Sequence, residues 1–523
     1  MKQNPWLYHA SLVSTLLCGC GPDERRIEPL TILAPTGGEN SEDAPTPTVT
    51  EAIPRAIPVG ESFTMRLVGA GFTSDTRVII GTHECPVVEW DESEIACIVP
   101  VQTELGTQQL TVGTQGRTAT STLPIYESGR VSEQFGIVTR GCESPTLPWG
   151  LDVDPNSGRI AVTGVVNRGA SGLHAFLWAF EADGTEVSDS PGCALELGRY
   201  PWSSMHALRL EGDHAILAGR VRDAQDNHFL ALARVSLDTT NPMPWLSVWP
   251  ELDPDSALAG VFRVDSGWRA AGHGTVGERR ALVAAAVDAD GTQEAEFGAD
   301  GLVGVDALQT DAITWRSQVS HVDGDLTALT SPENENGSEN ENGSENEDGN
   351  EAALVRFNRD GTLAIDWAVA GVADVVLPPG AGFNPGLSLD DEGRLYVTTT
   401  AGRDLLIGRY TSTGAIDLTF GSRGWLRVLA LDDASRSSYS FYGNGAVYLV
   451  GHLGTRAAIW KLWTRDGRLA RSFGDNGALS LPSTLVEAFV HTGAYDPSSD
   501  ELVVSGRANS EGVPAAFVLK LTP

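Results

Sequence analysis

The sequence predicts an all-β protein in which a small β domain precedes a seven-bladed β-propeller of four-stranded blades. Two lines of sequence carry the prediction. A short apolar line recurs seven times, from Ile160–Gly164 (IAVTG) to Leu502–Gly506 (LVVSG). A second apolar line follows each copy and often ends in an Asp-Gly turn, as in Ala175–Thr185 (AFLWAFEADGT). The spacing of about 50–55 residues is typical of propeller blades.

Composition limits the partners of the chain. The 523 residues include 69 acidic and 36 basic side chains, which gives a formal net charge of −33. Such a chain repels nucleic acid and anionic membrane surfaces, so we expect no nucleic-acid partner. The charge indicates an acidic, solubilising surface, and we expect a monomer.

The N-terminus has the features of a targeting segment. Lys2 precedes an apolar run, Ala10–Leu17, which is too short to span a bilayer permanently. The following Cys18-Gly19-Cys20 resembles the end of a bacterial lipoprotein signal. The resemblance implies a signal peptide over 1–19 and a lipid on Cys20. Gly21 after the cysteine implies delivery to the outer membrane or cell surface. The alternative is a plain secretory signal that happens to contain a cysteine.

Residues 20–51 are predicted to form a disordered tether. This segment is rich in Pro, Gly, Glu, Ser and Thr and has no apolar period. Such a composition cannot bury enough surface to offset the entropy of ordering. About thirty flexible residues span roughly 30 Å, which would hold the folded part away from a membrane.

Residues 52–127 show short alternating strands separated by turn residues, which predicts a small all-β domain. Pro58-Val59-Gly60, Gly69-Ala70-Gly71-Phe72 and Cys97-Ile98-Val99-Pro100 resemble, in their order, the IPT/TIG family. The resemblance implies an immunoglobulin-like β-sandwich. In such a sandwich we expect Cys85 and Cys97 to end adjacent strands and to form a disulfide, since export leads to an oxidising compartment. The alternative is a metal site with His83 as a third ligand, for which no fourth ligand lies nearby.

Cys142 and Cys193 are the other two cysteines downstream of the signal. Four cysteines allow three pairings. Each of these two precedes a Pro-Trp pair, Pro148-Trp149 and Pro201-Trp202, at equivalent positions of the first two blades. We therefore expect a Cys142–Cys193 disulfide on one face of neighbouring blades. Two unpaired thiols are the alternative.

Residues 130–523 contain the repeats and one insertion. The strings FGADG, FGSRG and FGDNG, with the Asp-Gly turns, resemble the delta-sixty repeat of bacterial β-propellers. Phe135–Val138 reads as a fourth strand with no blade before it, and Phe517–Leu521 as a third strand with none after it. Their pairing would complete the seventh blade and close the ring, which removes exposed sheet edges. Residues 332–351 repeat an acidic hexapeptide and predict a disordered, solvated loop.

No catalytic motif is apparent. The ten histidines are scattered, and the chain contains no HExxH, GxSxG, Walker or dinucleotide signature. Asp152–Asp154 and Asp288–Gly291 are interpreted as a strand end and a hairpin turn rather than calcium loops. We therefore expect no catalytic residue, no cofactor and no metal ligand. Among the tryptophans, Trp178 and Trp460 are predicted to pack in the core, and Trp149 and Trp202 to be exposed and able to stack on sugars.

Two hypotheses for function follow. The first is a non-catalytic, lipid-anchored cell-envelope protein that binds or displays a protein or glycan partner through the loop faces of the propeller. The second is a propeller-based enzyme of the lyase or glycoside hydrolase type, by analogy of fold only. Carboxylates, or a His–carboxylate pair, that converge in the central funnel would favour the enzyme.

Overall fold

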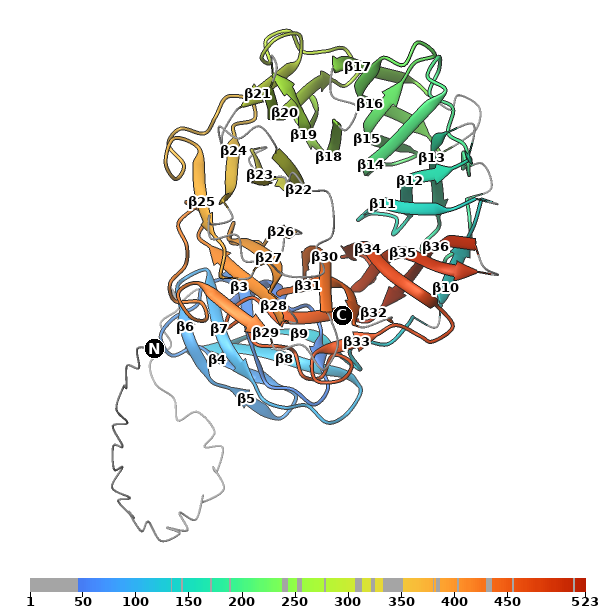
Figure 1. Ribbon diagram of the computed structural model, residues 1–523. Coiled ribbons are helices and arrows are strands. Elements are labelled where there is room, and N and C mark those ends of the chain that lie inside the picture. Colours follow the sequence, from blue (N-terminus) through green and yellow to red (C-terminus); the bar gives the residue numbers. More distant parts are fainter. Residues whose placement is uncertain are drawn as a thin grey trace, which may run out of the picture. The chain divides into compact units, whose positions relative to one another are not determined.

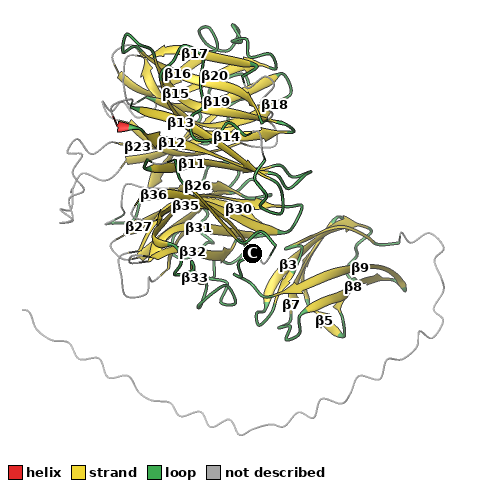
Figure 2. Ribbon diagram, turned by 90° about the vertical axis from the view of Figure 1, so that its right-hand side faces the viewer, coloured by secondary structure: helices red, strands yellow, loops and turns green. Residues whose placement is uncertain are grey.

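The computed structural model describes residues 46–523 apart from short gaps. The gaps are 133, 143, 170–171, 188–189, 238–242, 252–255, 277–278, 306–312, 321–324, 333–350, 380, 382–385, 402–403, 429–434, 454–455 and 511–512. The predicted signal peptide, most of the tether and the acidic loop therefore lie outside the described residues. The described part consists almost entirely of strands and loops (Figure 2). Within it, no helix has the length and apolar character needed to cross a bilayer.

The N-terminal domain is a sandwich of two sheets (Figure 1). The first has the order β1 (Thr48–Ile53), β3 (Phe63–Ala70), β7 (Glu94–Val99) and β6 (Val87–Trp90). The second has the order β2 (Ile57–Pro58), β9 (Arg117–Tyr126), β8 (Gly106–Thr114), β4 (Arg77–Ile80) and β5 (His83–Cys85). Buried and partly exposed residues alternate along β3, as expected for a strand with one face in the core.

The sandwich begins earlier than the sequence predicted. Strand β1 starts at Thr48 and pairs with β3, from Thr48 opposite Ala70 to Ile53 opposite Arg66. Residues 48–51 therefore belong to the sandwich and not to the tether. The prediction failed here because TVTE has no apolar side chain except Val49, and tertiary pairing overrides such a weak local signal.

The rest of the chain forms seven sheets around a ring (Figure 1), so the predicted propeller is confirmed. The sheets are blade 1, β11 (Thr146–Val153), β12 (Ile160–Asn167) and β13 (Leu173–Phe180); blade 2, β14 (Trp202–Glu211), β15 (His214–Arg222), β16 (His228–Ser236) and β17 (Trp245–Glu251); blade 3, β18 (Ala257–Val264), β19 (Gly267–Val276), β20 (Arg279–Asp288) and β21 (Leu302–Val305); blade 4, β22 (Ile313–Ser320), β23 (Leu326–Pro332), β24 (Glu351–Phe357) and β25 (Val372–Val376); blade 5, β26 (Gly386–Leu389), β27 (Leu395–Ala401), β28 (Asp404–Tyr410) and β29 (Trp425–Val428); blade 6, β30 (Ser435–Gly443), β31 (Ala446–Leu453), β32 (Arg456–Trp463) and β33 (Ala478–Ser480); and blade 7, β34 (Val486–Asp496), β35 (Glu501–Ser510), β36 (Val513–Leu521) and β10 (Ile137–Arg140).

The ring closes as predicted. Strand β10, from the start of the propeller, pairs antiparallel with the C-terminal strand β36, from Ile137 opposite Leu519 to Arg140 opposite Ala516. Lys520 on β36 donates to Asp496 at the end of β34 over 2.8 Å, and both side chains are buried. Blade 7 is therefore built from both ends of the propeller region, which removes two free sheet edges.

Blade 1 departs from the prediction of four strands because it has three. After β13 the described residues of the chain meet the sheet in two isolated bridges, Phe180–Glu186 and Leu177–Gly192. Gly192 has φ +74°, which interrupts the extended conformation that a fourth strand requires.

The blades pack face to face, and their central strands are buried on both sides. Strand β12, for example, is buried from Ile160 to Val166. Such strands read as continuous apolar runs, which explains the prominent sequence repeat. Trp178 and Trp460 are buried, as predicted for core residues.

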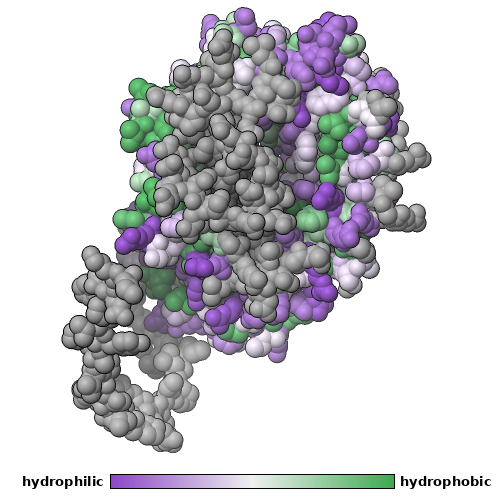
Figure 3. Space-filling model, viewed as in Figure 1, coloured by the Kyte–Doolittle hydropathy of each residue, from purple (hydrophilic) through white to green (hydrophobic). Residues whose placement is uncertain are grey.

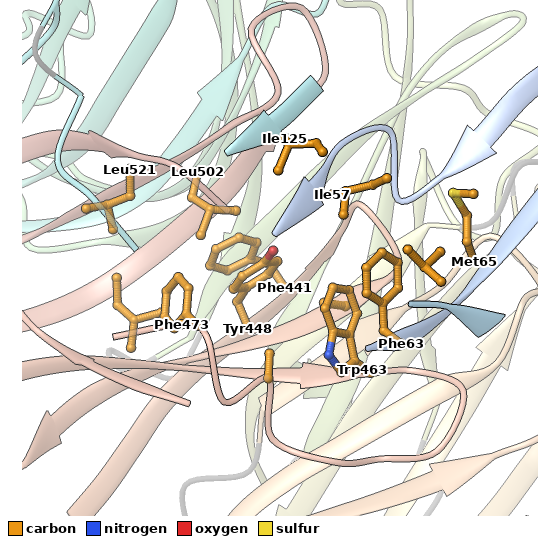
Figure 4. Close-up of a cluster of buried hydrophobic side chains, with 14 of the residues drawn as sticks. Ile57, Phe63, Met65, Ile125, Phe441, Tyr448, Trp463, Phe473, Leu502 and Leu521 are labelled. Atoms are coloured by element: carbon orange, nitrogen blue, oxygen red, sulfur yellow. The ribbon is translucent and has the colours of Figure 1, made fainter. Parts of the chain in front are cut away.

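The sandwich and blade 6 share one apolar cluster (Figure 4). Phe63 of the sandwich stacks on Trp463 of β32 with ring centroids 4.9 Å apart. Glu61 accepts hydrogen bonds from Trp463 Nε1 at 3.1 Å and from Ser472 Oγ at 2.7 Å. The contact thus combines apolar burial with a carboxylate whose two oxygens are both bonded across the interface.

Candidate site in the propeller funnel

A cavity of about 480 Å³ occupies the centre of the ring. It is lined mainly by the innermost strands of the blades, which lie around the open centre in Figure 1. Its polar and aromatic lining includes Trp149, Asp152, His206, Arg209, Tyr439 and Thr492. The volume lies within the range of about 300–1,000 Å³ that is common for small-molecule sites.

Bulges in the inner strands are a shared feature of this lining. The register shifts in β11, β14, β18, β22, β30 and β34, while β26 pairs regularly. A bulge inserts an unpaired residue and re-aims side chains, and bulges occur often next to functional sites. In β11 the shift falls around Trp149, and in β14 it falls around His206.

Trp149 and His206 meet at these two bulges. Their ring centroids lie 4.3 Å apart with a tilt of 55°. His206 Nε2 lies 3.0 Å from Ser204 Oγ. Burial, with the nearby positive charge of Arg220, holds the pKa of His206 well below its usual value. The imidazole is therefore neutral at pH 7, so the pair presents an uncharged aromatic surface.

Close packing of inner strands explains a glycine beside this pair. A Cβ on Gly150 would lie 3.0 Å from the Ala207 backbone on the neighbouring inner strand. Blades 1 and 2 approach each other closely here because position 150 has no side chain. Larger residues at this position would push β11 and β14 apart and separate Trp149 from His206.

Arg209 and Asp152 form the charged part of the lining. Arg209 Nη1 donates to Asp152 Oδ1 over 2.8 Å, and the backbone N–H of Leu210 donates to Asp152 Oδ2 over 2.8 Å. The Asp152 side chain is 9% exposed and that of Arg209 is 49% exposed. The negative charge of Asp152 raises the pKa of Arg209. The charge that faces the funnel is therefore the guanidinium.

Hydroxyl groups lie on the blade 5, 6 and 7 side. Thr492 hydrogen-bonds to the Tyr439 hydroxyl, and burial raises the pKa of Tyr439, so this phenol stays protonated at pH 7. Ser388 and Ser440 also line the funnel, and their buried hydroxyls have no hydrogen-bond partner within the described part of the chain. Buried polar groups of this kind are usually satisfied by ordered water or a ligand.

The described residues of the lining do not bring together an acid–base pair. Asp152 is the one carboxylate among the described residues of the funnel, and both of its oxygens accept hydrogen bonds from blade 2. His206, the one described histidine of the lining, bonds to Ser204. The arrangement that would have favoured an enzyme therefore does not occur among these residues. What remains is suited to stacking and hydrogen bonding.

Comparison with known families identifies the first domain. Residues 47–126 match the IPT/TIG domain family. The β-sandwich is an IPT/TIG domain. No curated protein matches the chain.

The solved structures that resemble the chain are distant from it in sequence. One is a structural genomics protein of unknown function from Bacteroides thetaiotaomicron, with 12% identity and a TM-score of 0.33 over 91% of this chain and 99% of the other. An auxiliary nutrient binding protein from the same organism has 13% identity and a TM-score of 0.31 over 91% and 98%. A Trypanosoma rangeli sialidase in complex with 2,3-difluorosialic acid has 11% identity and a TM-score of 0.36 over 75% and 56%. These similarities are too low to bear on function.

The cysteines divide into one disulfide and two thiols. Cys142 and Cys193 are bonded, with Cα atoms 5.5 Å apart, which confirms that prediction. Cys85 and Cys97 are free and buried in the IPT/TIG domain. The prediction that they form a disulfide at the ends of adjacent strands was wrong. Cys85 lies on β5 of one sheet and Cys97 on β7 of the other. They face each other across the core, and each perturbs the pKa of the other. Cys20 lies outside the described residues.

The two candidate tryptophans take different places. Trp149 lines the funnel, as a sugar-stacking residue would. Trp202 is not among the residues that line the funnel. The guanidinium groups of Arg220 and Arg222 lie over its ring instead, at 5.0 and 5.3 Å from the centroid.

No group of three or more potential metal ligands occurs among the described residues. Asp154 and Asp288 instead accept hydrogen bonds from backbone N–H groups of their own turns.

Sequence reasoning overlooked Arg209, Tyr439 and the structural role of Asp152. Each lies on an inner strand. The available signal was positional: Trp149, His206 and the residues that follow them occupy equivalent places in successive blades.

Proposed function

We propose that this protein is a non-catalytic binding protein of the bacterial cell envelope, anchored by a lipid on Cys20, whose propeller funnel binds a glycan. The observation that carries the proposal is the lining of the funnel. It combines the aromatic pair Trp149–His206 with an exposed guanidinium, while its described carboxylate is already bonded. Aromatic faces stack on the apolar faces of sugars, and the polar groups can bond to hydroxyls. The cavity of about 480 Å³ suits one or two sugar rings rather than a folded protein.

Trp149→Ala tests this proposal on a glycan array. We expect the variant to lose about 5- to 30-fold in affinity for glycans that the wild-type chain binds, since an aromatic stacking contact contributes about 1–2 kcal/mol. Trp90→Ala is a matched control because Trp90 is 47% exposed on the IPT/TIG domain, outside the funnel. Thermal unfolding of both variants separates lost binding from lost folding. Equal binding by wild type and W149A would place the ligand elsewhere.

The enzymatic alternative is tested on the same ligands. Each bound glycan is incubated with the protein and then analysed by mass spectrometry. An unchanged mass is expected for a binding protein. A cleaved or unsaturated product that disappears with W149A would instead establish a hydrolase or a lyase in the funnel.

A further inference from the structure

Most of the described polar side chains of the funnel lie on consecutive blades. Blades 6, 7, 1 and 2, which are consecutive around the ring, contribute Tyr439, Thr492, Asp152 and Arg209. Blade 5 adds the Ser388 hydroxyl, and the described lining residues of blades 3 and 4 are apolar. A ligand that fits this lining has a charged or strongly polar group that can lie against blades 6, 7, 1 and 2.

The exposed edge of Arg209 determines which charge the polar end carries. A guanidinium has five N–H donors, and Asp152 occupies the Nη1 position alone. The side chain is half exposed and lines the funnel, which leaves its other donors available to a ligand. Asp152 is shielded behind it by bonds to both of its oxygens. A cation entering the funnel would meet the guanidinium, whereas a carboxylate would find a planar pair of donors.

Tyr439 completes this end of the cavity. Tyr439 lies on blade 6 and Arg209 on blade 2, on different sides of the ring, and both line the funnel. Because the phenol remains protonated, it can donate a hydrogen bond to the same anion. A carboxylate between the two would therefore be held from opposite sides.

From this geometry we infer that the funnel binds an acidic sugar, a uronic acid, with its carboxylate on Arg209 and Tyr439 and its ring against Trp149. This inference rests on the proposed glycan-binding function and names the ligand class for the same site. Neutral sugars have no carboxylate to pair with the Arg209 guanidinium. When they bind, they remove water from the guanidinium without replacing its hydrogen bonds, which lowers their affinity.

The experiment compares sugars that differ only at C6. Binding of D-galacturonate and D-glucuronate, and of D-galactose and D-glucose, is measured by titration calorimetry with the mature chain. We expect the uronates to bind at least about 10-fold more tightly than the neutral sugars, and Arg209→Gln to lose about 10- to 100-fold in uronate affinity. Arg209→Lys keeps the positive charge but lacks the planar pair of N–H donors. This variant is therefore expected to recover part of the lost affinity. Tyr439→Phe is expected to lose several-fold.

Arg468→Gln is the matched control, because Arg468 is 66% exposed, is paired with Asp466 in a hairpin turn, and lies outside the funnel lining. Uronate binding that R209Q abolishes and R468Q preserves supports the inference. Equal affinity for neutral and acidic sugars, with no effect of R209Q, overturns it but leaves glycan binding intact. If neither uronate binds, the inference is also overturned, and the array with W149A then decides separately whether the funnel binds any glycan.

Discussion

The lysines of the folded part show how surroundings decide the state of a side chain. Lys520 is buried and donates to Asp496 over 2.8 Å, which lowers the pKa of that carboxyl. Lys461 is equally buried, but the described residues place no carboxylate in ion-pair contact with it. It lies 4.2 Å from the centre of the Trp463 ring and 3.4 Å from the Tyr126 hydroxyl. Burial lowers the pKa of Lys461 to about 7, although the more distant charges of Glu61 and Asp500 oppose the shift.

A single residue also decides the proposed anchoring. With the wild-type signal we expect the protein to partition into the detergent phase of a phase-separating detergent, because a lipid on Cys20 supplies the apolar anchor. Cys20→Ser should move the protein to the aqueous phase. Cys18→Ser, which changes the neighbouring cysteine, should leave partitioning unchanged. An aqueous wild-type protein would indicate a plain secretory signal.

At the scale of elements, the disulfide joins the two ends of blade 1. Cys142 lies just before β11, and Cys193 follows the bridge that stands in place of a fourth strand. The bond therefore secures the one blade that has three strands. Blade 7 is secured differently, by the pairing of β10 with β36. Each irregular blade thus has its own additional link.

Removing the disulfide tests this role. In the double variant Cys142→Ser, Cys193→Ser we expect the free energy of unfolding to fall by about 2–4 kcal/mol. The bond closes a segment of 51 residues and so restricts the unfolded chain. Denaturant unfolding of the oxidised wild type and the double variant measures the difference. The double variant Cys85→Ala, Cys97→Ala is the control. It also removes two cysteines, but it leaves the Cys142–Cys193 disulfide intact. An effect of C142S/C193S below about 0.5 kcal/mol would contradict the structural role.

At the scale of the whole molecule, the IPT/TIG domain and blade 6 form one buried cluster in which Lys461 is enclosed. Tyr126 comes from the IPT/TIG domain, and Tyr448 and Trp463 come from the propeller. The interface therefore contains a cation whose charged form is disfavoured by burial. Its contribution to stability must depend on pH.

The sign of this dependence follows from the two pKa values. In the folded protein the pKa of Lys461 is about 7, and its usual value is 10.5. Between these values the unfolded chain binds the extra proton, so stability rises as pH increases from about 7. Below that pH the lysine is charged in both states and its cost is constant. Above about pH 9 the buried tyrosines reverse the trend, since burial also raises the pKa of Tyr126 and Tyr448.

Denaturant unfolding at pH 7, 8 and 9 measures the effect. Wild type should gain stability over this range, by about 1 kcal/mol per pH unit. Lys461→Met retains the volume and removes the titrating group, so its stability should change much less. Parallel pH profiles for the two proteins would show that Lys461 is not the group responsible.

Much of the fold could be predicted because its signals are local. The second strand of each blade, such as Ile160–Gly164, is apolar throughout, since it is buried on both faces, and it recurs with a constant period. The closing pair was predictable from two incomplete copies at the ends of the repeat region. The Cys142–Cys193 bond was predictable from equivalent positions in neighbouring copies. Strand β1 and the positions of Cys85 and Cys97 were not, because they depend on which sheet each strand joins.

The sequence by itself determined the two domains, the seven repeats and the closure of the ring, because periodic burial imposes a pattern on neighbouring residues. Only the tertiary structure decided the chemistry of the funnel. Asp152, Arg209 and Tyr439 lie on three different blades, up to 287 positions apart in the chain, and no local pattern connects them. Ring closure brings the inner strands together, and their bulges turn Trp149 and His206 toward one another. A site whose residues converge from separate repeats becomes visible only once the repeats are arranged around a common centre.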